Sequence, residues 1–324
     1  MAEFDLIDLI RARCAIERAD VRLGIGDDAA ILAPPAGHDL VVSTDTLVEG
    51  VHFPASTGAR DLGWKALAVN LSDLAAMGAT PAWALLALTL PVADRAFVAD
   101  FADGFAELAA QHRVALVGGD TTSGPLSVTV VVHGFVPPER ALRRDGARIG
   151  DQVFVTGAIG DAAGGLACLE RRHPHLFEVP AEAREALIAR LERPTPRVAA
   201  GSALRDSATA CIDVSDGLLA DLGHIAARSG VGIELDAWKL PTSSALLSAF
   251  EENERLVLQA GGGDDYELAF TAPLERATTI ERDLARLGCG ATRIGTVVGG
   301  SGVRLLDAKG GEIRLSRRGW NHFA

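Results

Sequence analysis

Short apolar stretches rich in β-branched residues recur along the chain, and several of them break into glycine and aspartate. Residues Asp39–Val48 and Ser127–Val136 have the character of β-strands. Residues 114–117 predict a further strand, which ends in a tight loop at Gly118-Gly119-Asp120. The strands at 39–48 and 114–117 would therefore each deliver an aspartate near a strand end.

Residues 61–78 instead carry apolar positions at helical spacing, and Gly78 with Pro81 ends the pattern. Asp73 is the only charged residue of this predicted helix after Lys65. A carboxylate on a largely buried helix needs a partner that offsets its desolvation, and a metal ion is the natural candidate. Four apolar residues share one face of the helix: Leu67, Leu71, Leu74 and Ala75.

A polar, arginine-rich connection divides the chain. It runs from Pro137-Pro138 to Gly150-Asp151 and predicts domains at 1–137 and 150–324, as the length of 324 residues also favours. The second domain begins with a strand at Gln152–Thr156, followed by glycines at 157–165 that lead into a helix. Helices and strands then alternate to about residue 298, and a hairpin is predicted at 303–315. The pattern predicts two domains of the α/β class, with α+β mixing.

Composition narrows the function classes. The net charge of -12 repels nucleic acid and anionic lipid, so we expect neither as a partner. The longest uncharged apolar stretches, such as residues 82–92, are too short to cross a bilayer. The first five residues are acidic where a secretory signal would be basic, so we expect a cytoplasmic protein. The four scattered cysteines form no C-x-x-C pair, which disfavours a zinc site and a disulfide framework.

Five acidic clusters carry the chemistry. Magnesium takes oxygen ligands from carboxylates and hydroxyls, and a phosphate can reach an acidic surface through such a metal. Repeated like-charge neighbours cost free energy unless cations lie between them. The pattern therefore favours a magnesium-phosphate site. The clusters are Asp27-Asp28, Ser43-Thr44-Asp45, Asp73, Asp120 and Asp213-Val214-Ser215-Asp216.

Each cluster also has a simpler interpretation, because aspartate beside glycine is common in turns and helix caps. Taken alone, residues 213–217 predict a cap for the helix Leu218–Ser229, and the glycines at 261–263 predict a flexible linker. No G-x-x-x-x-G-K-[ST] sequence occurs, which excludes a Walker-type phosphate loop. His52 follows one acidic cluster, but a lone histidine near a strand end is usually structural.

Taken in order and spacing, these motifs resemble the thiamine-monophosphate kinase family. That family belongs to the ATP-binding superfamily that also holds aminoimidazole ribonucleotide synthetase and selenophosphate synthetase. The resemblance covers nearly the whole chain. The motifs are Gly24-Ile-Gly-Asp-Asp-Ala-Ala30, Ser43-Thr-Asp-Thr-Leu-Val48 with His52-Phe53, the helix motif 65–78, Gly118-Gly-Asp-Thr-Thr122, Ile212-Asp-Val-Ser-Asp-Gly217 and residues 262–268.

The resemblance implies magnesium-dependent transfer of the γ-phosphoryl group of ATP to thiamine monophosphate, giving thiamine diphosphate and ADP. It implies several magnesium ions. It also implies a homodimer in which the N-terminal sheets of two copies form a shared barrel. The C-terminal domain would complete the nucleotide and substrate cleft.

The resemblance also assigns residues. Six aspartates would be catalytic and would also bind metal: Asp28, Asp45, Asp73, Asp120, Asp213 and Asp216. Two hydroxyl residues, Ser43 and Thr44, would be further metal ligands. The nucleotide contacts would be Gly119, Asp120, Arg144 and Ser215. Thiamine monophosphate would be bound by His52, Asp264 and Trp320, the last by stacking on its rings.

Three alternatives make different demands on the residues. Another ATP-dependent synthetase of the superfamily is one alternative; selenophosphate synthetase, for example, would need a reactive cysteine and a lysine in a glycine-rich N-terminal segment, and only Cys14 lies near. A metal-dependent phosphohydrolase would use similar aspartates and release phosphate without forming ADP. A nonenzymatic metal-binding module would bind magnesium with no nucleotide-dependent change in stability.

Overall fold

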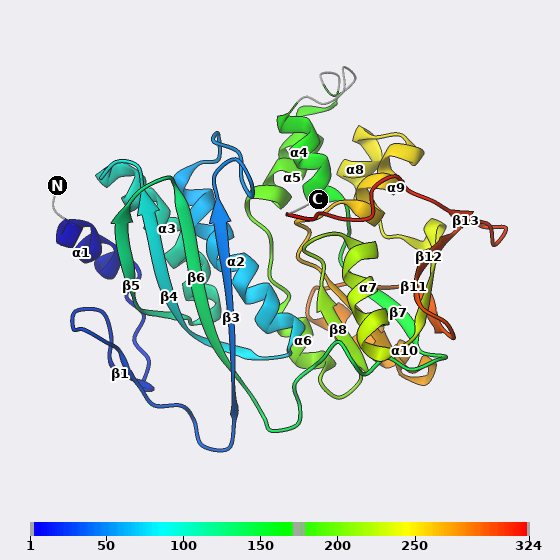
Figure 1. Cartoon of the computed structure of the whole chain (residues 1–324), viewed down its shortest axis with the longest axis horizontal. Coiled ribbons are helices and arrows are strands. Elements are labelled where there is room, and N and C mark those ends of the chain that lie inside the picture. Colours follow the sequence, from blue (N-terminus) through cyan, green and yellow to red (C-terminus); the bar gives the residue numbers. More distant parts are fainter. Residues whose placement is uncertain (1–2, 171–175, 177–178, 323–324) are drawn as a thin grey trace. The chain divides into compact units, whose positions relative to one another are not determined.

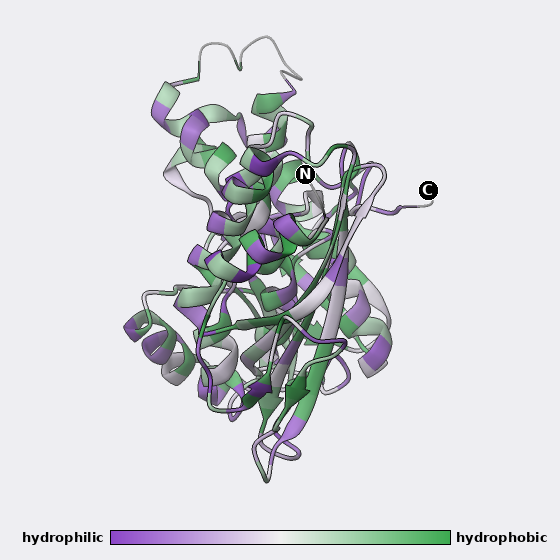
Figure 2. Cartoon of the chain, turned by 90° about the vertical axis from the view of Figure 1, so that its left-hand side faces the viewer, coloured by the Kyte–Doolittle hydropathy of each residue, from purple (hydrophilic) through white to green (hydrophobic). Residues whose placement is uncertain are grey.

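The computed structural model describes residues 3–170, 176 and 179–322, and the chain divides into two compact units (Figure 1). Unit 1 comprises residues 1–74 and 79–140, and unit 2 comprises residues 75–78 and 141–324. Each unit has its own β-sheet. Figure 2 shows helices that alternate between hydrophobic and hydrophilic residues along the ribbon, as expected for helices with one buried face.

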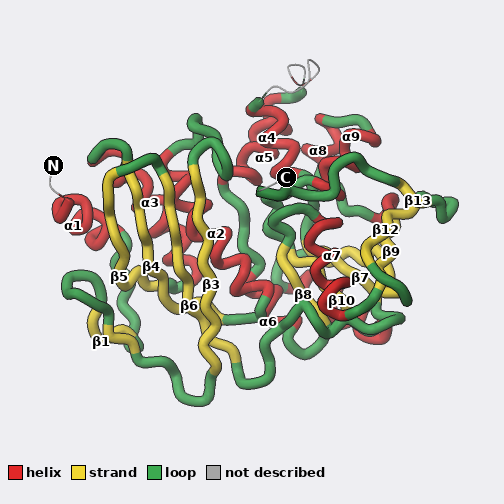
Figure 3. Tube along the Cα trace, viewed as in Figure 1, coloured by secondary structure: helices red, strands yellow, loops and turns green. Residues whose placement is uncertain are grey.

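Unit 1 is built around a four-stranded sheet in the order β3-β6-β4-β5, in which β4 and β5 are parallel (Figure 3). A small β1-β2 hairpin precedes the sheet. The elements are α1 (Glu3–Arg13), β1 (Val21–Leu23), β2 (Ile31–Leu32), β3 (Asp39–Val48), α2 (Ala59–Ala76), β4 (Thr80–Leu90), α3 (Arg95–His112), β5 (Ala115–Ser123) and β6 (Ser127–Val136). The strands predicted at 39–48 and 127–136 are confirmed with these bounds.

The two faces of this sheet differ in burial. On one face, alternate residues of β6 and β4 such as Val130 and Leu88 are fully buried. Successive side chains of a strand point to opposite faces of the sheet. The other face carries Leu40 and Val42 of β3, which are 49% and 52% exposed. We call these the covered face and the open face. Edge strand β3 thus presents apolar side chains without a covering layer from the described residues of its own unit.

Helices α2 and α3 cross in close contact. A Cβ at Gly63 would lie 2.0 Å from the Phe101 carbonyl oxygen, and one at Gly104 would lie 1.8 Å from the Arg60 oxygen. Only glycine permits this approach of two backbones. Asp94 caps α3 by accepting hydrogen bonds from the backbone N–H groups of the first turn.

Unit 2 contains a seven-stranded mixed sheet in the order β13-β12-β9-β11-β7-β10-β8, in which only β9 and β12 pair in parallel among the described strands. Its elements are β7 (Gln152–Thr156), α4 (Asp161–Leu169), α5 (Ala181–Glu192), α6 (Val198–Leu204), β8 (Ala210–Asp213), α7 (Leu218–Ser229), β9 (Gly232–Asp236), η2 (Ala237–Lys239), α8 (Ser244–Ala249), α9 (Glu252–Gly261), β10 (Leu268–Ala272), η3 (Leu274–Arg276), α10 (Ala277–Arg286), β11 (Ala291–Val298), β12 (Gly302–Leu306) and β13 (Glu312–Ile313). The α/β prediction, with its α+β mixing, is confirmed.

The core of unit 2 lies on both sides of this sheet. Val153 and Val155 of β7 pack in one cluster with the buried face of α7. Phe154, between them, points to the opposite side and stacks on Phe270 of β10 with ring centroids 5.2 Å apart, in a cluster that includes residues of α6 and α10. Alternation along β7 therefore serves two helical layers.

Two predicted loops are wrong. Residues 118–120 do not form a tight loop, because β5 continues through them to Ser123. Gly119 is needed for a close approach to β4, since a Cβ there would lie 1.8 Å from the Leu86 oxygen. Similarly, α4 begins at Asp161, so Gly165 lies inside the helix, where its missing side chain lets α5 approach at Leu187.

Among the described residues no helix is long and apolar enough to cross a membrane. All four cysteines are buried and unpaired, as Cys14, Cys168, Cys211 and Cys289 are free thiols. Burial raises the pKa of the Cys14 thiol to about 12, so this thiol stays protonated and unreactive near neutral pH.

Candidate active site

In unit 1, β3 and α2 bring three predicted metal ligands together. Ser43 and Asp45 lie two residues apart on the covered face of the sheet, next to α2. The Ser43 hydroxyl donates to Asp73 Oδ2 at 2.5 Å, and the Asp45 N–H donates to Asn70 Oδ1 at 3.0 Å. Asn70 therefore pairs with a backbone N–H of the edge strand β3. Asp73, about one helical turn further along α2, accepts the hydroxyl of Ser43.

Thr44 lies between these residues and faces the other way. Its hydroxyl donates to the Val130 carbonyl oxygen at 3.2 Å, and its residue position is exposed on the open face. Because the side chains of a strand alternate, Thr44 cannot join Ser43 and Asp45 through its hydroxyl. The Asp45 N–H points away from β6 toward Asn70, so the Thr44 carbonyl of the same trans peptide points toward β6.

Asp120 and Gly119 lie on β5, at the edge of the sheet opposite β3. Asp120 is in register with Ala87 of β4, which pairs with Thr129 of β6 and so places Asp120 on the open face. Three strand spacings of about 4.8 Å separate β3 from β5, so Asp45 and Asp120 lie on the order of 14 Å apart within one sheet. The structure does not bring these two aspartates together within one copy of unit 1.

Asp28 and His52 lie in turns that flank β2 and β3. The Asp28 N–H donates to Asp27 Oδ1 at 2.8 Å, so the first carboxylate of this like-charged pair closes a local turn. Asp28 is exposed. His52 Nδ1 accepts the Val48 N–H at 3.0 Å, which places the proton of a neutral ring on Nε2 and fixes the ring at the end of β3.

In unit 2, the loop between β8 and α7 carries Asp213, Ser215 and Asp216. The loop is held by Asp221 of α7, whose Oδ2 accepts the backbone N–H groups of Ser215, Asp216 and Gly217 at 3.0 to 3.1 Å. Three donors on one carboxylate oxygen fix this loop before any ligand binds.

Negative charge is concentrated around this loop. Burial, together with the neighbouring charges of Asp213 and Asp216, raises the pKa of the Asp221 carboxyl to about 8, against the N–H donors of the loop. Asp213 is itself only 3% exposed. A cation bound beside these carboxylates would relieve the repulsion between them.

The segment 261–264 packs directly against the same loop. The backbone N–H of Asp264 donates to the backbone carbonyl oxygen of Ser215 at 2.9 Å, and a Cβ at Gly263 would lie 2.4 Å from that carbonyl oxygen. The glycines thus permit close backbone contact, so their interpretation as a flexible linker is wrong. Asp264 and Ser215 are brought together by the backbone itself.

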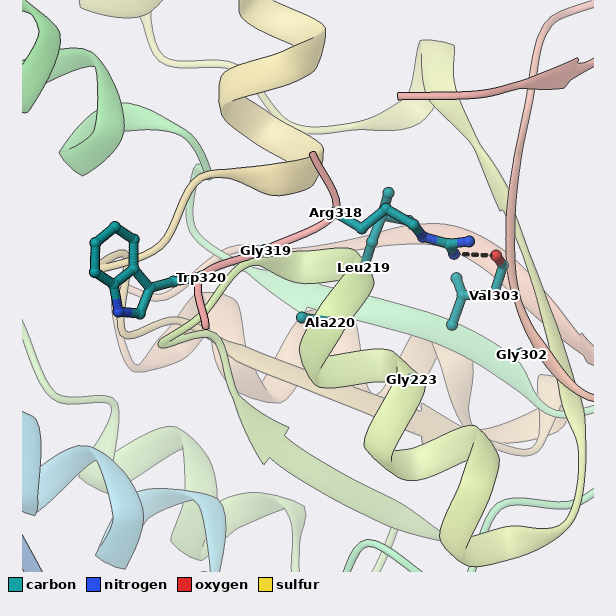
Figure 4. Close-up of a pocket in the computed structure, with 8 residues that line it drawn as sticks. All are labelled: Leu219, Ala220, Gly223, Gly302, Val303, Arg318, Gly319 and Trp320. Atoms are coloured by element: carbon teal, nitrogen blue, oxygen red, sulfur yellow. Dashed lines mark hydrogen bonds between the residues drawn. The ribbon is translucent and has the colours of Figure 1, made fainter. Parts of the chain in front are cut away.

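The C-terminal tail adds Trp320 to this group. The backbone N–H of Trp320 donates to the backbone carbonyl oxygen of Asp216 at 2.9 Å. The Arg317 guanidinium lies 4.9 Å from the centroid of the indole ring. A pocket of about 410 Å³ lies between the tail and α7, and Figure 4 shows the indole projecting from one end of it. Its lining residues are Leu219, Ala220, Gly223, Gly302, Val303, Arg318, Gly319 and Trp320.

Arg144 is exposed on the segment that runs beside β8. The preceding residue, Arg143, accepts the Cys211 N–H at 2.9 Å, and the Arg144 oxygen accepts the Ser229 hydroxyl at 3.0 Å. This segment therefore follows β8 and the end of α7. Within unit 2, backbone contacts join Ser215, Asp216, Asp264 and Trp320, whereas Arg144 is anchored along β8.

Sequence reasoning missed several buried acids of unit 2, among them Asp221, Asp265 and Glu267. Glu267 is fully buried and accepts hydrogen bonds from Arg190 at 2.9 Å and Arg197 at 2.7 Å. Asp265 accepts the backbone N–H groups at the start of α4. Asp221 lies in the first turn of α7, three residues after Leu218. An acid at this position can accept the free N–H groups at the start of a helix, and this was the signal in the sequence that could have identified it.

The donors present fit magnesium, which prefers carboxylate and hydroxyl oxygens. Across the described ranges, no group of three or more His, Cys, Asp or Glu residues could hold a metal ion by itself. Magnesium in nucleotide sites is usually held by one or two carboxylates together with phosphate oxygens and waters. Paired oxygens such as those of Ser43 and Asp73 suit that mode of binding.

Both units match one family of proteins. Residues 26–136 match the N-terminal domain of AIR synthase related proteins, and residues 148–307 match the C-terminal domain of the same proteins. The two matches together span most of the chain.

Full-length relatives give the closer relationship. The chain is 47% identical over 322 residues to the thiamine-monophosphate kinase of Escherichia coli K12, covering 99% of this chain and 98% of the relative. It is 52% identical in sequence to a thiamine-monophosphate kinase from Stenotrophomonas maltophilia K279a of known crystal structure. The two structures superpose with a TM-score of 0.87, over 94% of this chain and 96% of the other. A further structure, described as a complex with AMPPCP and TMP, is 36% identical with a TM-score of 0.78 and coverage of 99% and 97%. The chain therefore belongs to the thiamine-monophosphate kinase family.

Proposed function

We propose that this chain transfers the γ-phosphoryl group of ATP to the phosphate of thiamine monophosphate, giving thiamine diphosphate and ADP. The observation that carries the proposal is the junction in unit 2, where the loop with Ser215 and Asp216 is hydrogen-bonded to both Asp264 and Trp320. Residues assigned to the nucleotide and residues assigned to the acceptor thus share one backbone framework. The relative described with AMPPCP and TMP supports the same pair of substrates.

The acceptor needs little activation. The second pKa of a phosphate monoester is about 6, so its nucleophilic oxygen is mostly ionised near neutral pH and a strong general base is not required. The obstacle is repulsion between two polyanions, since unit charges about 4 Å apart repel by roughly 4 kcal/mol at an effective dielectric near 20. Catalysis therefore depends on charge neutralisation and positioning.

We further infer that this reaction uses magnesium, which when bound screens the phosphate oxygens and the charge that develops during transfer. Asp45 and Asp73, with Ser43, would hold it in unit 1, where the hydroxyl and Asp73 already lie 2.5 Å apart. Asp213 and Asp216 would do so in unit 2. Asp28 and Asp120 complete the proposed set.

Remaining contacts follow the chemistry of each substrate. Gly119, Arg144 and Ser215 are proposed to bind ATP, the guanidinium as a donor to phosphate oxygens. Asp264 and His52 are proposed to bind thiamine monophosphate, and the 44%-exposed Trp320 offers an aromatic face to its thiazolium cation.

A homodimer would remove two exposed features of unit 1. Strands β3 and β5 are the edges of its sheet, and unpaired edges invite pairing with another chain. Leu40 and Val42 also leave apolar surface on the open face. Two four-stranded sheets that close into one barrel would pair the edges and bury this face.

The test is to incubate purified protein with thiamine monophosphate, ATP and magnesium, and to quantify thiamine diphosphate and ADP. We expect both products in equal amounts, and an excess of chelator should abolish them. The variant Asp216→Asn should lose most of this activity. Asp283→Asn changes a partly exposed aspartate of α10 in the same way and should retain it.

Two other results would redirect the assignment. Release of thiamine and phosphate without ADP would identify a phosphohydrolase. Magnesium binding without any product, in protein that unfolds cooperatively, would identify a metal-binding module and contradict the kinase proposal.

A further inference from the structure

The segment that carries Asp264 is held in an unusual backbone conformation. Among the described residues, four that are not glycine have positive φ, and two of them lie here: Asp264 at 68° and Tyr266 at 50°. Such angles are uncommon for bulky residues and persist only when the surrounding structure imposes them. Two in one short segment point to a conformation kept for a purpose.

Backbone contacts impose this conformation from two sides. The N–H groups of Asp264 and Tyr266 donate to the oxygens of Ser215 and Val214 at 2.9 and 2.8 Å, which ties the segment to the β8–α7 loop. On the other side, Arg190 donates to the Asp265 oxygen at 3.2 Å. The segment is therefore fixed at each of its three residues.

The result is a direct contact between the two strained residues. The Tyr266 hydroxyl donates to Asp264 Oδ1 at 3.0 Å, while the tyrosine is only 7% exposed. A buried ring with its hydroxyl on a carboxylate fixes the rotamer of that carboxylate.

We propose that Tyr266 is a positioning residue for thiamine monophosphate. It orients the carboxylate of Asp264 toward the cationic ring system of the substrate. A carboxylate can accept about four hydrogen bonds, so the bond from Tyr266 does not exhaust it. The inference rests on the assignment of Asp264 to the substrate in the proposed function.

Kinetics of Tyr266→Phe test this role, because the substitution keeps the ring and removes the hydroxyl. We expect the KM for thiamine monophosphate to rise about tenfold, which is the size expected when a charge-assisted hydrogen bond is lost. The kcat and the KM for ATP should stay within about twofold, since the tyrosine touches no reacting group. Asp264→Asn should raise the same KM, and the double variant should add little to it.

Thr271→Val is the matched control. It also removes a buried hydroxyl, five residues further along on β10, where Thr271 contacts Thr209 at 2.7 Å. Its KM for thiamine monophosphate should equal that of the unchanged protein, even if its thermal midpoint falls. A loss of stability alone would thus be separated from the loss of a positioned carboxylate.

The chain offers a spectroscopic readout that does not depend on turnover, because Tyr266 is its only tyrosine. Protein labelled with carbon-13 at the tyrosine Cζ should give one resonance that reports the hydroxyl bond. We expect this resonance to shift in Asp264→Asn and to shift on titration with thiamine monophosphate. This measurement applies even if Tyr266→Phe folds poorly.

The outcomes separate two failures. If Asp264→Asn raises the KM for thiamine monophosphate but Tyr266→Phe does not, the role of Tyr266 is refuted while the substrate site stands. If Asp264→Asn leaves that KM unchanged, the assignment of Asp264 fails and the role of Tyr266 fails with it. A resonance that ignores both the substitution and the ligand also contradicts the proposal.

Discussion

Asp73 is the residue whose role follows most directly from its contacts. It lies on α2, a helix with fully buried neighbours such as Leu71 and Leu74, and it receives the Ser43 hydroxyl at 2.5 Å. A carboxylate in this setting gains from a cation that offsets its desolvation. The hydroxyl contact shows what α2 contributes: it brings an acid to the covered face of β3.

We expect Asp73→Asn to keep the fold and to lower magnesium-dependent kcat by about 100-fold, because an electrostatic group is lost and the amide oxygen still accepts the Ser43 bond. The thermal midpoint without magnesium should change little, and its rise with added magnesium should shrink. Asp100→Asn, an exposed position on α3, is the control. Unchanged turnover in Asp73→Asn would remove this residue from the site.

Asp265 predicts a pH effect on stability. Burial raises the pKa of its carboxyl to about 8, although the N–H groups of Gly160 and Ala162 oppose the shift. The unfolded value is about 3.9, so the native state favours the neutral acid. Its contribution to stability is full below about pH 4 and is lost as the pH rises toward 8.

Asp265→Asn removes this titration. We expect the urea midpoint of the variant to depend less steeply on pH between 5 and 8 than that of the unchanged protein. The variant should be less stable at pH 5 by roughly 1 to 3 kcal/mol, because an amide presents one acceptor where the acid presents two. Parallel pH profiles for the two proteins would contradict the raised pKa.

At the scale of elements, the sequence predicts helices and strands better than it predicts where two backbone segments pass close to each other. The bounds of β3, β6, β7 and α7 follow from apolar spacing alone. The glycines at 119 and 263 resemble loop residues because a sequence does not reveal which backbone passes nearby. Asp221 was missed for a related reason, since its three N–H partners come from the loop that precedes its own helix.

Gly263→Ala tests whether the contact between the two loops matters. The new Cβ would lie 2.4 Å from the Ser215 oxygen, so the backbones must separate at a cost of roughly 1 to 3 kcal/mol. We expect a lower thermal midpoint and a kcat/KM reduced at least tenfold for both substrates.

Gly223→Ala is the opposite case and the control for Gly263→Ala. A Cβ at Gly223, inside α7, meets nothing within 4 Å, and alanine is favoured over glycine in a helix by about 1 kcal/mol. This variant should be stabilised. If both variants behaved alike, a steric contact at Gly263 would not be the cause.

At the scale of the whole molecule, the family and the two domain types could be recognised from motif order, whereas the relation between the aspartates could not. Strand alternation separates Thr44 from its neighbours, and sheet order separates Asp45 from Asp120 by about three strand spacings. Neither fact is visible until β3 and β5 are known to be opposite edges.

Val42→Glu tests the proposed dimer. A charge at this 52%-exposed position of β3 would be buried if two open faces met, and an unpaired buried charge is strongly unfavourable. We expect the mass measured by light scattering to fall from about twice 33.8 kDa to that of one chain. A dimer that persists with full activity would place the interface elsewhere.

The separation of Asp45 from Asp120 makes a sharper prediction about such a dimer. If two sheets close into one barrel, β5 of one copy lies beside β3 of the other, so Asp120 would lie next to the part of the second copy's β3 that carries Thr44 and Asp45, and the two copies would share one site. Asp45→Asn and Asp120→Asn should each be inactive as homodimers. Heterodimers of the two, co-expressed with different tags and purified on both, would contain one site with both substitutions and one intact site. About half of the original activity should therefore return, as twofold symmetry requires. If both aspartates served one site from a single copy, every site would carry one substitution and the heterodimer would stay inactive.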